Sequence, residues 1–285
     1  MTENQLKHAC LYVVATPIGN LGDMVPRAVQ VLQTVDVIAA EDTRHSKRLM
    51  QHFDISTPLL AYHDHSGAHT VDNLISTLCD GASVALISDA GTPLVSDPGY
   101  RLVDAALAAG VKVVPIPGAS AAIAALSAAG LPSDRFVFEG FLPAKSGARQ
   151  KQLQSLEAES RTLIFYEAPH RLLESLRDMA AVFGQERQAV LARELTKTFE
   201  TIRRDSLAGL ADWVAADSNQ QRGECVLLVR GADNRDGDEA EGRRVFDILA
   251  EELPLKQAAA LAARISGAKK NSLYQYGLDR NKAGG

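Results

Sequence analysis

The sequence predicts an α/β protein with two domains and a small C-terminal helical extension. Short apolar runs alternate with helical segments near the start of the chain, as in an α/β layer. The alternation begins again after the turn Pro117-Gly-Ala-Ser120. A length of 285 residues also suits about two domains. We therefore expect an N-terminal α/β domain at 1–116, a C-terminal α/β domain with a mixed sheet at 117–232, and an extension at 233–285.

The first domain begins with a strand, a turn, a helix and a second strand. Its strands are expected at 11–15, 37–40, 83–87 and 111–115. Pro26 in the first turn predicts a helix over 26–34. A later helix is expected to begin with Asp97 as N-cap and Pro98 at the first helical position, and to stop at Gly110.

The second domain begins with an alanine-rich helix that ends at Gly130. Its later strands follow one another closely, which favours antiparallel pairing and a mixed sheet. The strands are expected near 136–141, 162–166, 189–193, 200–203 and 225–230, and the helices near 150–158, 171–183 and 207–216.

The extension is predicted to open with an acidic linker, because residues 233–243 contain glycine and lack apolar periodicity. Three short helices are expected at 244–252, 255–266 and 270–280. From Glu252 onward, six basic residues stand against two acidic ones, a net charge of +4 in a chain of net charge −5. This tail fits a helix-turn-helix that contacts RNA, or else a packing element of a dimer or of the domains.

The composition is that of an ordinary globular protein, with 46% hydrophobic and 23% charged residues. No apolar run reaches the roughly 20 residues of a membrane helix. The polar, acidic first residues predict no targeting segment, so we expect a cytoplasmic protein. Cys10, Cys79 and Cys225 lie far apart in apolar sequence, which favours reduced core cysteines over a disulfide framework or a zinc site.

Several common site motifs are absent. The chain has no G-x-G-x-x-G after its first strand, no P-loop, no G-x-S-x-G elbow and no H-E-x-x-H. The run His63-Asp64-His65, together with His69, lacks a convincing further ligand. We therefore expect no metal and interpret this segment as a polar loop that faces the substrate.

Three tight turns that carry Pro and Gly each follow a predicted strand. They are Thr16-Pro-Ile-Gly-Asn20, Asp89-Ala-Gly-Thr-Pro93 and Pro117-Gly-Ala-Ser120. Ligands of open α/β sheets bind at the carboxyl ends of the strands, where Gly admits a ligand to the backbone and Pro stiffens the loop. A groove of this kind suits a zwitterionic cofactor with a sulfonium, an adenine and a ribose. The alternative is three ordinary βα turns.

Sequence motifs along nearly the whole chain resemble those of the tetrapyrrole methylase superfamily. They are Thr16-Pro-Ile-Gly-Asn-Leu-Gly-Asp23, Ala40-Glu-Asp-Thr-Arg-His45, Ser88-Asp-Ala-Gly-Thr-Pro-Leu-Val-Ser-Asp-Pro-Gly99, Pro117-Gly-Ala-Ser-Ala-Ala122, Glu139-Gly-Phe-Leu-Pro143, Thr162-Leu-Ile-Phe-Tyr-Glu-Ala-Pro-His-Arg171, Ala192-Arg-Glu-Leu-Thr-Lys197 and Gly223-Glu224. More narrowly, they look like the ribosomal small subunit methyltransferase I branch, bacterial enzymes that methylate the ribose 2′-hydroxyl of a cytidine in 16S rRNA. The resemblance implies a two-domain tetrapyrrole-methylase-like fold with S-adenosylmethionine in the cleft between the domains.

The resemblance also implies which residues bind the cofactor. The first turn would form one wall of the site, the second turn would cradle the amino-acid end and ribose, and Ser120 and Ala121 would meet the cofactor from the second domain. Phe165, Tyr166 and the strand around 226–227 would lie near the adenine. These residues are Pro17, Ile18, Gly19, Asp89, Gly91, Thr92, Pro93, Ser120, Ala121, Phe165, Tyr166, Val226 and Leu227.

Methylation of a ribose hydroxyl benefits from a base, or from a cation that stabilises the developing alkoxide. Glu41 or Asp42 could act as the base or hold one, and Arg44 could grip a phosphate. The alternative is that these acids mark a helix N-terminus. Lys197 is our candidate for stabilising the alkoxide, against the alternative of a salt-bridged surface.

The predicted substrate contacts are His45, Lys145, Arg149, Arg193, Lys269 and Lys270. The resemblance implies 16S rRNA or the small ribosomal subunit as partner and a homodimer as assembly, with no role for a membrane. Two other functions stay open. One is methylation of a small tetrapyrrole, which the same fold supports, and the other is a non-catalytic RNA-binding protein.

Overall fold

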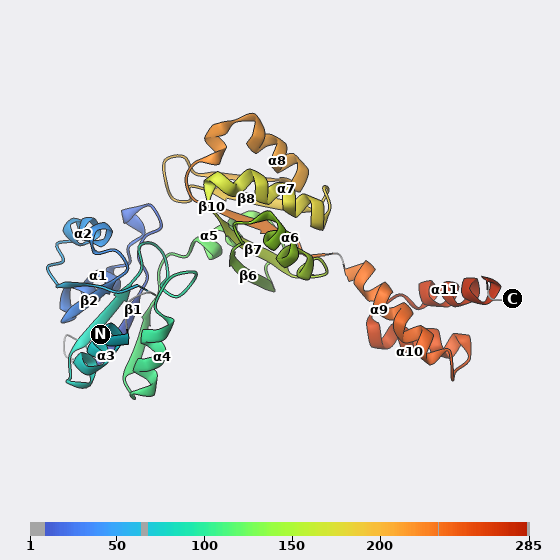
Figure 1. The fold of residues 1–285 in the computed structure, drawn as a ribbon, viewed down its shortest axis with the longest axis horizontal. Coiled ribbons are helices and arrows are strands. Elements are labelled where there is room, and N and C mark those ends of the chain that lie inside the picture. The colour runs from blue at the N-terminus through green and yellow to red at the C-terminus, as the bar shows by residue number, and fades with distance from the viewer. Residues whose placement is uncertain (1–8, 64–67, 233, 284–285) are drawn as a thin grey trace.

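A computed structural model describes residues 9–63, 68–232 and 234–283. It consists of two α/β domains and a helical lobe at the C-terminal end, set apart from both (Figure 1). The fold class agrees with the prediction. Within the described residues, no helix is both long and apolar enough to cross a membrane.

The first domain is built on a five-stranded sheet with the strand order β3-β2-β4-β1-β5, in which every pairing is parallel. The strands are β1 (Cys10–Val14), β2 (Val37–Ala40), β3 (Leu59–Ala61), β4 (Ser83–Ile87) and β5 (Lys112–Ile116). The helices are α1 (Pro26–Thr34), α2 (Thr43–His52), α3 (Ala68–Cys79) and α4 (Tyr100–Ala108).

Both faces of this sheet are covered by helices, because successive strand residues point to opposite sides. Leu11 packs with α3 and α4 in one core cluster. Its neighbour Tyr12 packs with α1 and α2 in another. All five carboxyl ends of a parallel sheet lie along one edge, so the loops that follow these strands gather there.

The second domain is built on a mixed sheet with the order β6-β7-β10-β8-β9. Only the β6–β7 pairing is parallel. The strands are β6 (Phe136–Phe141), β7 (Thr162–Glu167), β8 (Gln188–Arg193), β9 (Thr201–Ser206) and β10 (Cys225–Val229). The helices are α5 (Ala121–Ala129), α6 (Ser146–Ser155), α7 (Leu172–Phe183) and α8 (Leu207–Ala216).

The two faces of the second sheet have different coverings. One face, which we call the back face, packs against α6, α7 and α8. The other, the front face, packs against α5 and also contacts Ile18 from the first domain. The part of the front face beyond α5 is thereby available to line a cleft.

The helical lobe has a hydrophobic core of its own, centred on Phe246, Ala258 and Leu273. Its helices are α9 (Asn234–Leu249), α10 (Leu255–Ser266) and α11 (Lys270–Ala283). Gly267 ends α10 in a left-handed conformation with φ 82°, as a turn between two helices requires. The predicted linker is wrong in its extent, because α9 already begins at Asn234.

Other local predictions also need correction. Asp97 does not cap α4, whose N-cap is Gly99. The loop continues instead through Leu94 and Ser96, both with positive φ. Cys79 is exposed and is not a core residue, whereas Cys10 and Cys225 are buried. The sequence patterns did not predict β3 or α3.

Candidate active site

Two adjoining cavities lie between the two sheets. The first, which we call the Tyr166 chamber, has a volume of about 330 Å³ and a mostly apolar lining that includes Tyr166, Ala192 and Val226. The second, the His45 chamber, has a volume of about 340 Å³ and a lining that includes His45 and Lys197. Three residues line both chambers and so mark where they meet: Ile18, Ala90 and Glu224.

The predicted turn at 16–20 forms a wall of the cleft. Thr16 and Gly91 exchange backbone hydrogen bonds of 2.8 and 3.1 Å, which tie this turn to the loop after β4. Gly91 has φ +85°, a conformation that other residues rarely adopt. Pro17, Ile18 and Gly19 all line the His45 chamber, as their predicted position in the cleft requires.

Glu41 and Asp42 brace the loop after β4 and line neither chamber. The Asp42 N–H donates to Asp89 Oδ1 at 3.1 Å, and the Asp89 N–H donates to Glu41 Oε2 at 3.4 Å. Asp42 is also the N-cap of α2, where it accepts from the Arg44 N–H at 2.8 Å. Its hydrogen bonds with Arg44 lower the pKa of Asp42. Asp42 therefore caps the N-terminus of a helix, which is the alternative role that the sequence left open for it.

The loop that follows Asp89 reaches both domains. The Thr92 hydroxyl donates to the Ala119 carbonyl at 3.0 Å, and Pro93 is buried. The three residues Gly91, Thr92 and Pro93 line neither of the two chambers. The cavity wall is made instead by the second half of the same motif, Val95-Ser96-Asp97. Burial raises the pKa of the Asp97 carboxyl, and the nearby charge of Asp89 raises it further.

The strands of the second sheet contribute alternate side chains to the cleft. Tyr166 and Val226 line the Tyr166 chamber from the front face. The side chains of Phe165 and Leu227 are wholly buried on the back face, so only the backbone of these two predicted residues can face the cleft. Strand alternation in the sequence could have separated the two pairs.

Tyr166 also joins the sheet to the start of α5. Its hydroxyl accepts a hydrogen bond of 3.3 Å from the Ala122 N–H. Burial raises the pKa of this phenol. Ala121 lines the same chamber, and Ser120 is the N-cap of α5 without a side-chain capping bond. The third predicted turn itself lines neither chamber, whereas Ala121, the residue that follows it, lines the Tyr166 chamber.

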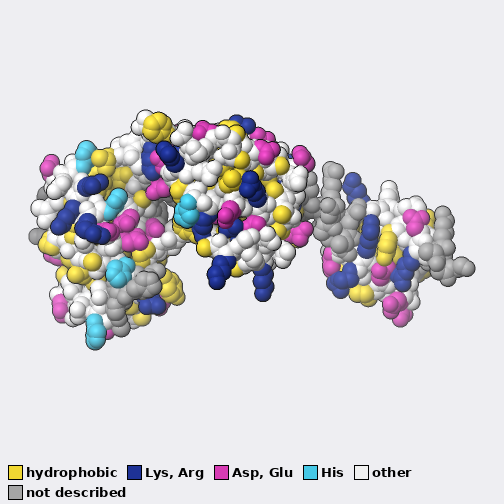
Figure 2. Space-filling model, turned by 45° about the horizontal axis from the view of Figure 1, so that its top comes forward, with side chains coloured by type: hydrophobic (Ala, Val, Ile, Leu, Met, Phe, Trp, Pro, Cys, Tyr) yellow, Lys and Arg dark blue, Asp and Glu magenta, His cyan; other side chains and the backbone are white. Residues whose placement is uncertain are grey.

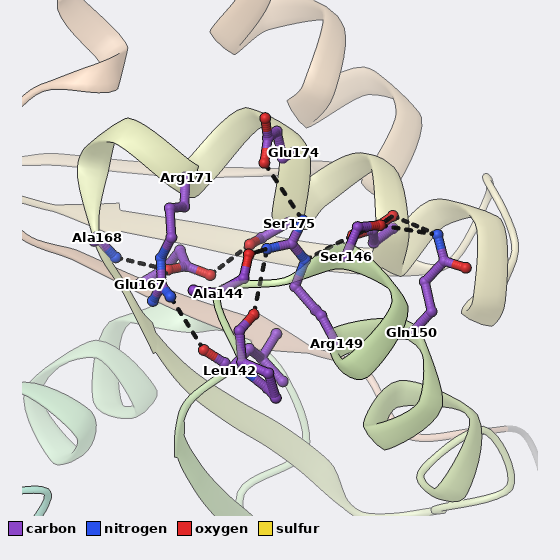
Figure 3. Close-up of polar contacts among 12 residues, drawn as sticks. Leu142, Ala144, Ser146, Arg149, Gln150, Glu167, Ala168, Arg171, Glu174 and Ser175 are labelled. Atoms are coloured by element: carbon purple, nitrogen blue, oxygen red, sulfur yellow. Dashed lines mark hydrogen bonds and ion pairs between the residues drawn. The ribbon is translucent and has the colours of Figure 1, made fainter.

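A buried ionic network supports the floor of the Tyr166 chamber (Figure 3). Glu167 lines this chamber and is only 2% exposed. Its carboxylate accepts hydrogen bonds from the Ala168 N–H at 2.8 Å and from the Ser175 hydroxyl. It also pairs with Arg171 at 2.6 Å. These contacts fix the turn at Ala168, which is part of the cavity wall.

Arg149 does not face RNA, contrary to the prediction. Its side chain is 1% exposed and pairs with Asp178 at 2.6 Å. Its guanidinium also donates to the carbonyls of Pro143 and Ala144, and these contacts hold the loop before α6 (Figure 3). Arg149 shares a helix face with the buried Leu153, a spacing of four residues that marks the inner side.

Arg193 is likewise a structural residue and not an exposed substrate contact. It is 8% exposed and lines neither chamber, whereas its neighbour Ala192 does. Its guanidinium donates to the carbonyls of Arg222 and Phe199 at 3.3 and 3.4 Å. The predicted substrate contact is therefore wrong for the same reason as for Arg149.

Lys197 stands at the junction of the two domains. Its side-chain stem packs on Gly19, where an added Cβ would lie 2.5 Å from the Lys197 Cγ. Its ammonium bonds Glu194 at 2.8 Å and Glu224 at 3.1 Å. Burial works against the charge, yet the hydrogen bonds to the two carboxylates outweigh it and raise the pKa of Lys197. Lys197 is therefore a cation beside the cleft.

The remaining predicted contacts are on the surface. Arg44 has a side chain that is 89% exposed, and His45 is exposed on the wall of its chamber. Lys145, Lys269 and Lys270 are exposed, the last two in the helical lobe. Acidic and basic side chains are interspersed over the face shown in Figure 2.

Metal ligands are not grouped in the described part of the chain, where no cluster of three or more His, Cys, Asp or Glu residues is found. Asp64 and His65 of the predicted polar loop lie outside the described residues.

Several lining residues were not predicted from the sequence. They come from the turn after β1, from α2, from the loop after β4, and from strand ends of the second sheet with the loops beside them. These residues are Thr16, Leu21, Ser46, Arg48, Leu49, Ser88, Ala90, Val95, Ser96, Asp97, Phe141, Glu167, Ala168, Pro169, Ala192, Leu195, Glu224 and Cys225. The motifs contained most of them, but only the fold shows which members face the cavity.

A cleft at the carboxyl edge of a parallel sheet places this protein in the class of ligand-binding α/β proteins. The family model described as Tetrapyrrole (Corrin/Porphyrin) Methylases matches residues 10–211. A second model, described as the RsmI C-terminal HTH domain, matches residues 236–281. The chain belongs to the tetrapyrrole methylase family. Within that family it groups with curated relatives that are 65%, 58% and 56% identical to it.

Those relatives carry the name Ribosomal RNA small subunit methyltransferase I. The protein of Pseudomonas aeruginosa is 65% identical over 95% of this chain and 97% of its own length. The protein of Vibrio cholerae is 58% identical, with 94% of each chain covered. The protein of Escherichia coli O157:H7 is 56% identical over 95% of each.

Solved structures share the fold at low sequence identity. A uroporphyrin-III-C-methyltransferase from Thermus thermophilus has a TM-score of 0.56 and 20% identity, with 78% of this chain and 94% of that chain covered. A diphthine synthase has a TM-score of 0.58 and 15% identity, with 78% and 89% covered. These matches support the fold alone.

Proposed function

We propose that this protein transfers a methyl group from S-adenosylmethionine to the ribose 2′-hydroxyl of a cytidine in 16S rRNA. The observation that carries the proposal is the pair of joined chambers, one mostly apolar and one whose wall includes Arg48 and Lys197 together with acids. Membership of a methylase family supports methyl transfer. Relatives named as ribosomal RNA methyltransferases support RNA as the substrate.

The Tyr166 chamber fits the cofactor. Its apolar surfaces, including Val226 and Leu195, suit an adenine, and the ring of Tyr166 offers an aromatic wall. Asp97, on the opposite loop, offers a carboxylate to a positively charged ligand. The bound cofactor would supply an activated methyl group on a sulfonium.

The His45 chamber fits the substrate nucleoside. His45 and Arg48 lie on its wall, and the exposed Arg44 is on the same helix. The guanidinium groups of Arg44 and Arg48 suit the phosphates that flank a ribose. Lys197 holds a positive charge near the place where negative charge develops on the 2′-oxygen.

The proposal also includes a role for the helical lobe and a form of assembly. The helical lobe, with Lys269 and Lys270 exposed, is proposed to contact the rRNA or the small ribosomal subunit. A homodimer in the cytoplasm is the expected form of the enzyme.

The test uses purified protein, labelled S-adenosylmethionine and small ribosomal subunits that lack their native methylations, followed by nuclease mapping. A ribose-methylated cytidine in the 16S rRNA is the expected product, and natively methylated subunits should take up no label at that position. Absence of label with intact cofactor binding would move the proposal to a small tetrapyrrole substrate. Absence of cofactor binding at about 1 mM, the upper end of common KM values, would overturn both and leave an RNA-binding protein.

A further inference from the structure

We propose that Glu224 is the catalytic residue that accepts the proton of the ribose 2′-hydroxyl. This inference rests on the proposed function and adds the base that the reaction uses. The sequence pointed to Glu41 or Asp42 for this role. In the structure both lie outside the two chambers and are engaged by the Asp89 loop and by Arg44.

Glu224 stands where a methyl group would pass from one ligand to the other. It is the one titratable residue among the three that line both chambers; the other two are Ile18 and Ala90. A group at this junction can reach a hydroxyl that approaches the cofactor from the His45 chamber. The other acids of the cleft wall each have access to one side. Asp89 lines the His45 chamber, whereas Asp97 and Glu167 line the Tyr166 chamber.

The main chain of Glu224 is held firmly in this place. Its N–H donates to Glu194 Oε1 at 2.9 Å, and its carbonyl accepts from the Glu194 N–H at 2.9 Å. Gly223, with φ +79°, lies so close to Glu194 that an added Cβ would be 2.3 Å from the Glu194 Cδ. A side chain at residue 223 would therefore be strained at this φ and would push aside the Glu194 carboxylate that accepts from the Glu224 N–H.

The side chain of Glu224 is left accessible by the same arrangement. Lys197 bonds both acids, but the Glu194 side chain is 17% exposed and that of Glu224 is 74% exposed. Glu194 can hold the ammonium of Lys197 while Glu224 turns toward a substrate. Lys197 would then lie beside both the carboxylate and the reacting oxygen.

The step balances without any further reactant. The 2′-oxygen forms a bond to the methyl carbon, and the carbon–sulfur bond breaks with its electron pair going to sulfur. The hydroxyl proton passes to the Glu224 carboxylate and from there to solvent, to which this side chain is open. The charge of Lys197 stabilises the oxygen while the proton leaves.

The experiment compares Glu224→Gln with Asp89→Asn and Asp97→Asn, one acid for each position in the cleft. Single-turnover methylation of undermethylated small subunits is followed across a range of pH, and the affinities for S-adenosylmethionine and for RNA are measured on the same preparations. Loss of a general base lowers a rate by about 10²–10⁴-fold. We expect a loss of this size for Glu224→Gln, with near-native affinities and a rate that rises steadily with pH. Glu224→Asp should recover part of the rate.

A second background separates catalysis from simple support of Lys197. In a Lys197→Gln protein, Glu224→Gln should still lower the single-turnover rate by about 10²–10⁴-fold. If Glu224 only held Lys197, the second substitution would change nothing, and the inference would be wrong. A loss of that size in Asp89→Asn, with Glu224→Gln near the wild-type rate, would also overturn it. A wild-type protein that methylates no RNA would refute the proposed function itself, whereas an active wild type with an equally fast Glu224→Gln refutes this inference alone.

Discussion

The two α/β domains contribute to one cleft in different ways. The first domain contributes loops, because all of its strands are parallel and their carboxyl ends meet at one edge. The second contributes a sheet face, because its mixed strands present alternate side chains such as Tyr166 and Val226. A loop motif is visible in a sequence as a run of neighbours, whereas a sheet face is assembled from residues far apart.

The predicted basic residues also differ between the two domains, in whether their side chains are exposed or buried. In the first domain, Arg44 and His45 follow a strand end and are exposed, and His45 lines the cleft. In the second, Arg149 and Arg193 are buried and hold loops through backbone carbonyls. A basic residue in a sequence motif of the second domain is therefore weaker evidence of RNA contact than a basic residue in a motif of the first domain.

The largest effect expected is on stability, from Arg149→Met. Removing one partner of a buried ion pair leaves the Asp178 carboxylate without its charged partner, at a cost of about 3–5 kcal/mol. The exposed neighbour Lys145 is the matched control, and Lys145→Met should stay within about 0.5 kcal/mol of wild type. Urea unfolding measures both. Equal stability of the two variants would contradict the structural role of Arg149.

The next comparison tests the two faces of the second sheet. Leu227→Ala should destabilise the protein by about 2–5 kcal/mol, because it opens a cavity in the back-face core. Its folded form should bind S-adenosylmethionine normally. Tyr166→Leu should instead weaken cofactor binding, since an aromatic surface under a base contributes about 1–3 kcal/mol. Calorimetric titration together with urea unfolding separates the two effects. Equal losses of cofactor affinity would contradict the division into faces.

The sequence predicted some of these features of the fold and the cleft and not others. The strand–turn–helix order predicted both α/β domains and the part of the cleft formed by Ile18 and Asp89. It did not distinguish Phe165 from Tyr166, because a motif match treats neighbours alike although a strand turns them apart. It also could not find Glu224 at the chamber junction, since that position depends on two domains packing together.

A smaller effect is expected from removing the helical lobe after residue 233. The lobe has its own core, so the α/β domains should keep their cofactor affinity. Binding to RNA should weaken, and its salt-dependence slope should fall by about 0.7–0.9 for each phosphate that the shortened protein no longer neutralises. Filter binding at several salt concentrations measures this slope. A collapse of cofactor affinity would show instead that the lobe supports the α/β domains.

The smallest effect is expected for Asp97→Asn, which should raise the stability of the protein but weaken its binding of the cofactor. Burial raises the pKa of Asp97 in the folded protein, so the folded state binds this proton more tightly than the unfolded state does. Well above both pKa values the carboxylate is ionised in both states, and its burial lowers stability. Below the unfolded value of about 3.9 it is protonated in both, and the penalty disappears.

Asp97→Asn should therefore raise the melting temperature near neutral pH, and this gain should shrink as the pH falls toward about 4. The same substitution should weaken binding of S-adenosylmethionine, because the chamber loses its carboxylate opposite Tyr166. Thermal unfolding over this pH range and cofactor titration at neutral pH test the pair of effects. A lower melting temperature at neutral pH would mean that hydrogen bonds to Asp97, such as that from Ser88, outweigh its burial. In that case the carboxylate would belong to the structural part of the loop, as Glu41 and Asp42 do.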